Sequence, residues 1–467
     1  MADKKTEEKV ECAWEKYDDT EKRAVFDLAN RYRAFMSKCK TERECVATFI
    51  EMAEEKGYKN LDDIIKNNGK LKAGDKVYAN NYDKSLALFV VGERSFEEGM
   101  RILGAHIDSP RIDLKQNPLY EDTGFAMLKT HYYGGIKKYQ WVTIPLALHG
   151  VVVRKDGTKV NIEIGEKADD PVFGITDLLI HLSKDQMGKS LKEAFTGEDL
   201  NITIGNIPVN DKEEKDRIKK NVLNILKSKY DITEEDFVSA EIEAVPAGPA
   251  RDYGLDSSMV MAYGHDDRIC AYTSFEAMMK IENPDKTCVT LLVDKEEIGS
   301  VGATGMHSKF FENALAEVMN AAGDYSELKL RRTLTNSMML SSDVSAAFDP
   351  NYPSVTEKQN SAYFGKGVVF NKYTGSGGKG GSNDANPEYI ARIRAIMDKN
   401  NVSWQTAELG KVDQGGGGTI AYILGNYGMN VIDCGIALHN MHAPWEIASK
   451  ADIYEAVRGY HVFLLEA

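Results

Sequence analysis

The sequence lacks the features that would place it in a membrane, secreted or nucleic-acid-binding class. It has no run of about 18 consecutive apolar residues, so no segment is expected to span a membrane. Its first ten residues, MADKKTEEKV, are charged and contain no apolar core of a signal peptide. Acidic residues outnumber basic ones by 72 to 58, for a formal net charge of −14. This excess argues against capture of nucleic acid or anionic lipid.

Cysteine is scarce and follows no metal-binding or disulfide pattern. The six cysteines stand at positions 12, 39, 45, 270, 288 and 434, with no C-x-x-C pair and no histidine at zinc-knuckle spacing. In a chain of this size without a secretion signal, we expect reduced, buried thiols. The expected compartment is the cytosol.

A length of 467 residues predicts two or three domains. Apolar residues at three-to-four spacing predict helix over residues 7–38 and, more weakly, over 40–66. Short apolar runs at 85–91 and 101–105 predict buried strands. Between residues 114 and 249 the pattern of apolar and polar residues changes to one that is typical of an α+β insertion. Strands are predicted there at 139–153, 158–164 and 201–204, with a Lys/Glu-rich helix near 212–228.

From about residue 255 onward, apolar strands alternate with helices. The predicted strands are 287–293, 337–340 and 430–436, and the predicted helices are 267–283, 307–322 and 453–464. Strands that are apolar throughout and separated by helices indicate an α/β fold, with helices on both faces of a mixed sheet.

Histidines and carboxylates cluster at the ends of these elements. They are His106 and Asp108 after 101–105, Glu296 and Glu297 after 287–293, Asp343 after 337–340, His439 and His442 after 430–436, and Asp266 and Asp267 at the start of the 267–283 helix. Functional residues of an α/β sheet collect at one rim, where strands end. Each motif alone is weak, but their repetition favours a divalent metal site. Five segments deliver these residues. One ligand from each segment gives five ligands, which suffice for two metals that share one carboxylate.

Two metals would supply a hydrolytic chemistry. Cations about 3.5–4 Å apart can hold a water, lower its pKa toward about 7 and polarise a carbonyl oxygen. A carboxylate that is not a ligand must then take the proton and pass it to the leaving amine. Glu296 and Glu297 are adjacent, so one can face a metal while the other faces the water. Asp108 is placed to orient the imidazole of His106.

The ordered motifs GAHIDSP, GHDDR, DKEEIGS, SSDVSAAFDP and HNMHAPWE resemble those of the M18 metallo-aminopeptidases, the aspartyl aminopeptidase and aminopeptidase I group. The segment YYGGIKKYQW at 132–141 extends the resemblance across the chain. The resemblance implies two zinc ions and a role for each site residue: His106 and Asp343 on one zinc, Glu297 and His442 on the other, Asp266 rather than Asp267 as the bridge, Glu296 as general base, and Asp108 in support of His106.

The same resemblance implies a zinc-exopeptidase-like catalytic domain, residues 1–113 plus 250–467. It is interrupted by a β-rich dimerisation or lid domain, residues 114–249. It further implies a tetrahedral dodecamer built from dimers that encloses the active sites. In that family a histidine from a neighbouring subunit helps to complete the site. His131, His149 and His181 are the candidates, and the sequence does not choose among them.

Two points of chemistry stay open at this stage. Lys372 lies where acid-specific members of the family place a basic residue, but the segment NKYTGSGGKGG departs from the expected pattern. The preferred N-terminal residue is therefore undecided. Cobalt or manganese fits a similar ligand geometry to zinc.

The remaining motifs are two glycine-rich stretches and three histidines. The stretch GSGGKGGS at 375–382 lacks the Ser/Thr of a phosphate-binding loop, because Gly380 stands in that place. The stretch DQGGGGT at 413–419 is either a tight turn or a loop whose backbone amides bind a carboxylate or carbonyl oxygen. We interpret the remaining motif histidines as structural, namely His265, His307 and His439.

The sequence therefore predicts a cytosolic metal-dependent aminopeptidase that removes the N-terminal residue from peptides, with Glu296 as general base. One alternative is a related amidohydrolase that acts on N-acyl amino acids, which product analysis would distinguish. The other is a non-enzymatic, self-assembling shell protein whose metals only brace the fold. In that case metal removal would disassemble the particle with no activity to lose.

Overall fold

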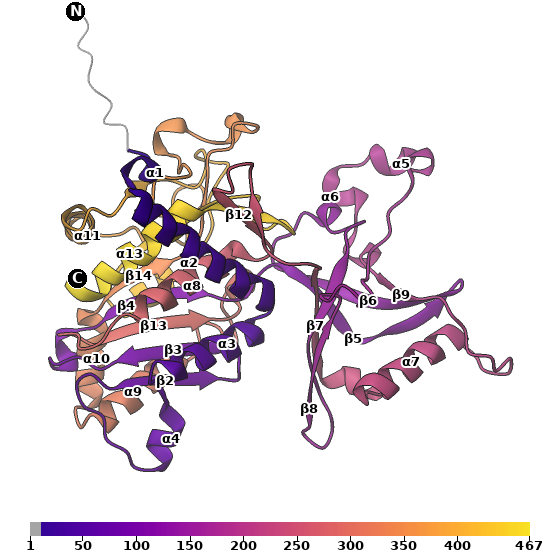
Figure 1. Ribbon diagram of the computed structural model, residues 1–467, viewed down its shortest axis with the longest axis horizontal. Helices are drawn as coiled ribbons and strands as arrows, with labels where there is room; N and C mark the ends of the chain where they lie inside the picture. Colours follow the sequence, from indigo (N-terminus) through magenta and orange to yellow (C-terminus); the bar gives the residue numbers. More distant parts are fainter. Residues whose placement is uncertain (1–10) are drawn as a thin grey trace, which may run out of the picture.

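The computed structural model describes residues 11–467, which form two lobes (Figure 1). We call the larger lobe the α/β body (residues 11–110 and 251–467) and the smaller one the β extension (residues 111–246). Residues 1–10, whose charge argued against a signal peptide, lie outside the described residues, as do the first four residues of the predicted 7–38 helix. Within the described range, no helix combines the length and apolarity needed to cross a membrane.

A nine-stranded mixed sheet forms the centre of the body. Its four central strands run parallel, and antiparallel neighbours flank them. In spatial order the strands are β1 (Lys59–Asn60), β2 (Lys76–Asn81), β3 (Ser85–Val90), β13 (Cys288–Val293), β4 (Arg101–His106), β14 (Met338–Ser342), β18 (Asn430–Gly435), β16 (Val368–Asn371) and β17 (Trp404–Thr406). The carboxyl ends of the four parallel strands therefore meet at one edge, where ligands of α/β proteins collect.

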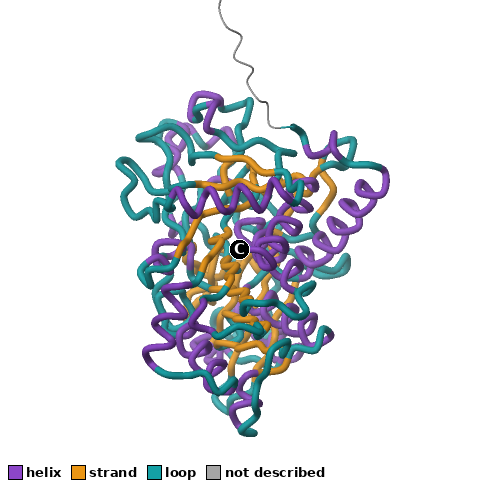
Figure 2. The backbone as a smooth tube through the Cα atoms, turned by 90° about the vertical axis from the view of Figure 1, so that its left-hand side faces the viewer, coloured by secondary structure: helices purple, strands orange, loops and turns teal. Residues whose placement is uncertain are grey.

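Helices cover both faces of this sheet (Figure 2). In β3, Leu86 and Leu88 pack into one apolar cluster, whereas Ala87 and Phe89 pack into the other. The first cluster includes α2 (Asp19–Lys38), α3 (Glu42–Glu55), α8 (His265–Met278), α11 (Pro387–Lys399) and α13 (Lys450–Glu466). The second includes α4 (Leu61–Lys66), α9 (Phe310–Ala321), α10 (Glu327–Asn336) and α12 (Ala421–Gly425). The predicted α/β class is confirmed.

A five-stranded sheet lies beside the rim of the large one. Its strands are β11 (Arg251–Tyr253), β12 (Met259–Ala262), β20 (Glu446–Ser449), β19 (Ala437–His439) and β15 (Ser345–Ala346). Strand β12 leads into Asp266, β15 follows Asp343, and His442 lies between β19 and β20. This sheet therefore holds three of the predicted ligand segments together.

The β extension is built on a six-stranded antiparallel sheet. Its strands are β8 (Lys159–Ile164), β7 (Leu146–Val153), β10 (Ala240–Pro246), β5 (Arg111–Asp122), β6 (Phe125–Tyr133) and β9 (Ile202–Gly205). Helix α7 (Arg217–Tyr230) packs against this sheet through Ile218 and Val222. Two short helices, α5 (Lys184–Met187) and α6 (Leu191–Ala194), lie in the segment between β8 and β9.

Three predicted elements differ clearly from the structure. The predicted helix 40–66 is divided into α3 and α4, with strand β1 between them. The predicted helix 7–38 is divided into α1 (Ala13–Lys16) and α2, because the Asp18 carboxylate accepts the N–H of Thr20 and Glu21 and starts a new helix. The predicted strand 139–153 begins only at Leu146. Pro145 has no N–H to donate to a ladder, and the residues before it form a turn.

Buried charges join the extension to the body. The Lys40 ammonium contacts Glu166 Oε1 at 2.5 Å and the Pro246 carbonyl at 2.6 Å. His149 Nδ1 lies 2.7 Å from Glu44 Oε1, and its Nε2 lies 3.1 Å from Glu166 Oε1. These contacts raise the pKa of His149 to about 9, against the lowering effect of burial. His149 is thus an ion-pairing residue of this junction.

Candidate metal centre

The five predicted ligands come from five segments that meet beside the carboxyl ends of the parallel strands. His106 is the last residue of β4, and Asp343 stands one residue beyond β14. Asp266 lies in the first turn of α8, Glu297 in a short turn after β13, and His442 in the loop between β19 and β20. The fold therefore brings together residues that are up to 336 positions apart, from His106 to His442.

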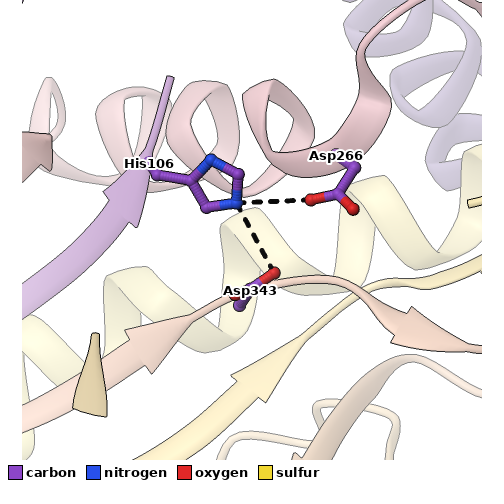
Figure 3. Close-up of side chains that lie close together, drawn as sticks. All are labelled: His106, Asp266 and Asp343. Atoms are coloured by element: carbon purple, nitrogen blue, oxygen red, sulfur yellow. Dashed lines mark ion pairs between the residues drawn. The ribbon is translucent and has the colours of Figure 1, made fainter. Parts of the chain in front are cut away.

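The ligand atoms form two triads that share one carboxylate. His106 Nε2 lies 3.3 Å from Asp266 Oδ1 and 3.8 Å from Asp343 Oδ1 (Figure 3). His442 Nε2 lies 3.1 Å from Asp266 Oδ2 and 3.5 Å from Glu297 Oε1. Within each triad, all ligand atoms are within 4.8 Å of one another. Asp266 thus directs one oxygen to each triad.

Electrostatics at the triads fit divalent cations. Desolvation and the nearby Asp266 carboxylate raise the pKa of Glu297 well above its usual range. Desolvation also raises the pKa of Asp343, together with the neighbouring Asp267 carboxylate. Glu297 Oε1 is buried and has no hydrogen-bond partner. A cation at each triad would offset this crowding of negative charge, and imidazole with carboxylate is a donor set that suits zinc.

The two predicted ligand histidines are held in the same tautomer. His106 Nδ1 lies 3.0 Å from the Asp108 carbonyl, and His442 Nδ1 lies 2.8 Å from the Gly135 carbonyl. A carbonyl only accepts, so each Nδ1 carries the donated proton and each Nε2 is left for a metal. Gly135 comes from the loop after β6, so the extension orients one of the ligands.

Asp108 holds the segment that bears the two glutamates. Its Oδ1 accepts the N–H of Glu296 and its Oδ2 the N–H of Glu297, both at 3.2 Å. The Tyr133 hydroxyl, from β6, donates to the same Oδ2 at 2.7 Å. The sequence interpretation missed Tyr133. Its place in YYGG gave no sign of this contact, which depends on how the extension folds against the body.

Glu296 belongs to neither triad but faces the same space. Its Oε2 lies 3.9 Å from His106 Nε2. Desolvation raises the pKa of Glu296 to about 7. Glu296 lines a cavity of about 440 Å³ that all five predicted ligands also line. This is the arrangement expected of a proton acceptor beside a metal pair.

The rest of the cavity wall is uncharged. Gly416, Gly417, Gly418 and Thr419, from the glycine-rich stretch at 413–419, contribute to it. No lysine or arginine lies among its described lining residues, which also include Asn371, Thr374, Leu409, Tyr422 and Met441. The predicted substrate residue Lys372 is not among them, and its ammonium pairs with Asp384 at the surface.

Neighbouring residues of the ligand types have other partners. Asp267 Oδ2 accepts the N–H of His106 at 3.3 Å, so Asp267 faces away from the shared position that Asp266 occupies. The other motif histidines bond elsewhere: His265 with Tyr32, His307 with Tyr422, and His439 with the Phe348 carbonyl. Their interpretation as structural agrees with these contacts.

Comparisons with known proteins point to one family. The family model described as "Aminopeptidase I zinc metalloprotease (M18)" matches residues 35–464. A Clostridium acetobutylicum protein named "Probable M18 family aminopeptidase 1" is 67% identical over 452 residues, which cover 97% of each chain. The crystal structure of an M18 aminopeptidase from Thermotoga maritima superposes with a TM-score of 0.93 at 45% identity, covering 98% of this chain and 99% of the other.

The same fold occurs at much lower identity. A structure described as the S. cerevisiae mApe1 dodecamer has a TM-score of 0.76 at 20% identity, and covers 94% of this chain and 96% of that one.

Proposed function

The chain belongs to the M18 family of zinc metallo-aminopeptidases, hydrolases that act on peptides, and we propose that it releases N-terminal residues through a two-zinc centre with Glu296 as general base. One observation carries the proposal. Asp266 directs Oδ1 to one triad and Oδ2 to the other, while Glu296 faces the same cavity and belongs to neither triad.

Each zinc ion would have its own ligands besides the shared Asp266. His106 and Asp343 would hold one ion, and Glu297 and His442 the other. When bound, the two ions would lower the pKa of a water molecule and polarise the scissile carbonyl. Cobalt or manganese can replace zinc in such a donor set.

Glu296 moves the proton in this scheme. Its pKa of about 7 would fall in the presence of two bound cations, so the Glu296 carboxylate would be ionised when the substrate arrives. Its Oε2 accepts the proton of the attacking water and then delivers it to the nitrogen of the leaving peptide. Asp108 fixes the backbone N–H of Glu296 and so limits the positions that this carboxylate can take.

The cavity favours an uncharged N-terminal side chain. Its described lining residues offer no cation to an acidic side chain, and Leu409, Tyr422 and Met441 give it apolar surface. Lys372, the predicted acid-binding residue, is neutralised by Asp384 outside the cavity. We therefore expect neutral aminoacyl-arylamides to be hydrolysed in preference to aspartyl and glutamyl ones.

The β extension provides the surface for self-association, in a tetrahedral dodecamer built from dimers. Between residues 172 and 191 it exposes a run of large apolar side chains, which we call the apolar arm: Val172, Leu178, Leu179, Ile180, Leu182, Met187 and Leu191. Apolar patches of this kind mark protein–protein contacts. His181 lies within the arm and is exposed, whereas His149 is engaged at the junction. His181 is thus better placed than His149 to reach a neighbouring active site.

The cysteines support a reducing compartment, the cytosol. All six are free thiols, and five of them are buried. Stable free thiols are usual where glutathione keeps proteins reduced.

Replacement of Glu296 tests the proposal. Glu296→Gln keeps the shape of the side chain but removes the base, so kcat should fall by about 10²–10⁴-fold. Zinc content should stay at two per chain, because Glu296 belongs to neither triad. Product analysis with a free peptide and an N-acyl amino acid separates peptidase from amidohydrolase. Undiminished turnover in the variant would contradict the role of Glu296.

A further inference from the structure

One buried carboxylate joins the two ligand segments that flank the shared position. Glu446, the first residue of β20, is 1% exposed. Its Oε1 accepts the N–H of His442 at 2.7 Å, and its Oε2 accepts the N–H of Asp266 at 3.0 Å. Both oxygens are thus bonded to the backbone of ligand-bearing residues, and neither belongs to a metal triad.

The small sheet fixes Glu446 relative to both segments. In the antiparallel pair of β12 and β20, Glu446 stands opposite Ala262, four residues before Asp266. On the other side, His442 precedes Glu446 by four residues in the loop from β19. The ladder therefore places a single carboxylate where the two chain segments converge.

His442 depends on an external partner for its backbone conformation. Its φ of +65° lies in the left-handed region, which residues other than glycine rarely adopt. Glu446 accepts the N–H of this same residue, and a hydrogen bond to a carboxylate is stronger than one to a neutral acceptor. The bond stabilises the conformation that directs the His442 imidazole toward Asp266 and Glu297.

We propose that Glu446 is a positioning residue that sets the separation between Asp266 and His442 and so determines the zinc affinity of the triad Asp266, Glu297 and His442. The proposal rests on the two-zinc centre proposed above. Glutamine at this position has one acceptor instead of two, and its amide N–H would oppose one of the backbone N–H groups. Loss of a partner that orients metal ligands typically weakens metal binding by 10–100-fold.

Asp452 provides a matched control. It is fully buried on α13, six residues farther along the chain. Its carboxylate also accepts backbone N–H groups, including those of Gly365 at 2.8 Å and Gly367 at 2.7 Å. Neither glycine belongs to a triad. Asp452→Asn therefore removes the same kind of interaction at comparable burial without touching a ligand segment.

The experiment titrates metal-depleted wild type, Glu446→Gln and Asp452→Asn with zinc against a chromophoric chelator. The wild type should bind two zinc ions per chain. In Glu446→Gln one of the two affinities should fall by about 10–100-fold while the other changes little. Activity of this variant should rise with added zinc beyond the concentration that saturates the wild type. Asp452→Asn should keep both wild-type affinities.

Two results would overturn the positioning role: wild-type zinc affinities in Glu446→Gln, or the same loss in Asp452→Asn. A wild type that binds no zinc would instead contradict the proposed function. If Glu446→Gln does not fold, amide hydrogen exchange of the metal-free wild type decides. The His442 amide should be protected despite its place in a loop, and rapid exchange there would overturn the proposal.

Discussion

The α/β body and the β extension each carry an unfavourable feature, and the two features are of opposite kinds. The body gathers carboxylates at the rim of its sheet, and desolvation together with neighbouring carboxylates raises the pKa of Glu297 and Asp343. The extension instead exposes the apolar arm to water. Burying like charges and exposing apolar surface are both unfavourable in an isolated chain. Bound metals would offset the first feature, and the self-association proposed above would bury the second.

The two regions are also coupled at the site. Tyr133 of the extension donates to Asp108 of the body, which in turn holds the backbone of Glu296 and Glu297. The Arg111 guanidinium lies 3.9 Å from the centre of the Tyr133 ring and pairs with Glu42 of α3. The proposed assembly through the extension would therefore act on the same contacts that support the predicted metal ligands.

The largest expected effect comes from charge in the apolar arm. Leu179 is 55% exposed, and Leu179→Glu should leave the chain folded but abolish assembly, because a carboxylate would be buried at the contact. Mass photometry would measure the particle size. Leu328→Glu is the control, since Leu328 is 56% exposed on α10 of the body.

An intact particle in Leu179→Glu, or disassembly by Leu328→Glu alone, would place the contact elsewhere. The kcat of the dissociated variant is the second quantity to measure. A kcat that falls with dissociation would show that the body needs a neighbour as well as metals.

A smaller effect is expected at the junction, from His149. Its pKa is about 9 in the folded chain and about 6.5 in an unfolded one. Because the folded value is the higher one, the stabilisation is fully present below pH 6.5 and is lost as pH rises through 9. The charged groups around this imidazole are Glu44, Glu166 and Lys40. Their interaction with protonated His149 contributes about 3 kcal/mol at most.

The measurement compares wild type and His149→Gln by urea unfolding at pH 6 and pH 9.5, at one protein concentration. The variant should be less stable at pH 6, and the difference should shrink at pH 9.5. His131→Gln is the control, because His131 lies exposed on β6 of the same sheet. A difference between wild type and His149→Gln that does not depend on pH would contradict the assigned charge state.

The smallest effect is expected for Lys372. Since its ammonium pairs with Asp384 outside the cavity, Lys372→Ala should change kcat/KM for leucyl and aspartyl arylamides by less than about twofold. A selective loss of aspartyl hydrolysis would show instead that Lys372 turns into the cavity when substrate binds. The neutral specificity proposed here would then be wrong.

Much of the site follows from the sequence because the chemistry sits at strand ends. His106, Glu297 and Asp343 each follow an apolar run. Because those runs alternate with helices, the sequence predicted that their ends meet at one rim of a sheet. The M18 family and the enzyme class are confirmed by the comparisons. The assigned role of each site residue stays a prediction.

Other features depend on contacts that no local pattern encodes. Tyr133 reaches Asp108 only because β5 and β6 pair with Arg111 opposite Tyr133, and neither strand was predicted. Strand β5 contains Pro118 and several charged residues, which interrupt the alternation of apolar and polar residues that would predict a strand. Glu446 sits within the HAPWE motif, but its contact with Asp266 arises from the pairing of β12 with β20.

The central claim is a two-metal centre in which Asp266 binds both ions. The most direct measurement is the zinc content per chain of wild type and Asp266→Asn by elemental analysis, together with leucyl-arylamide hydrolysis before and after chelation. We expect two zinc ions in the wild type, chelator-sensitive hydrolysis, and loss of tight zinc binding and of activity in the variant. One zinc or none in an active wild type, or full activity after chelation, would contradict it.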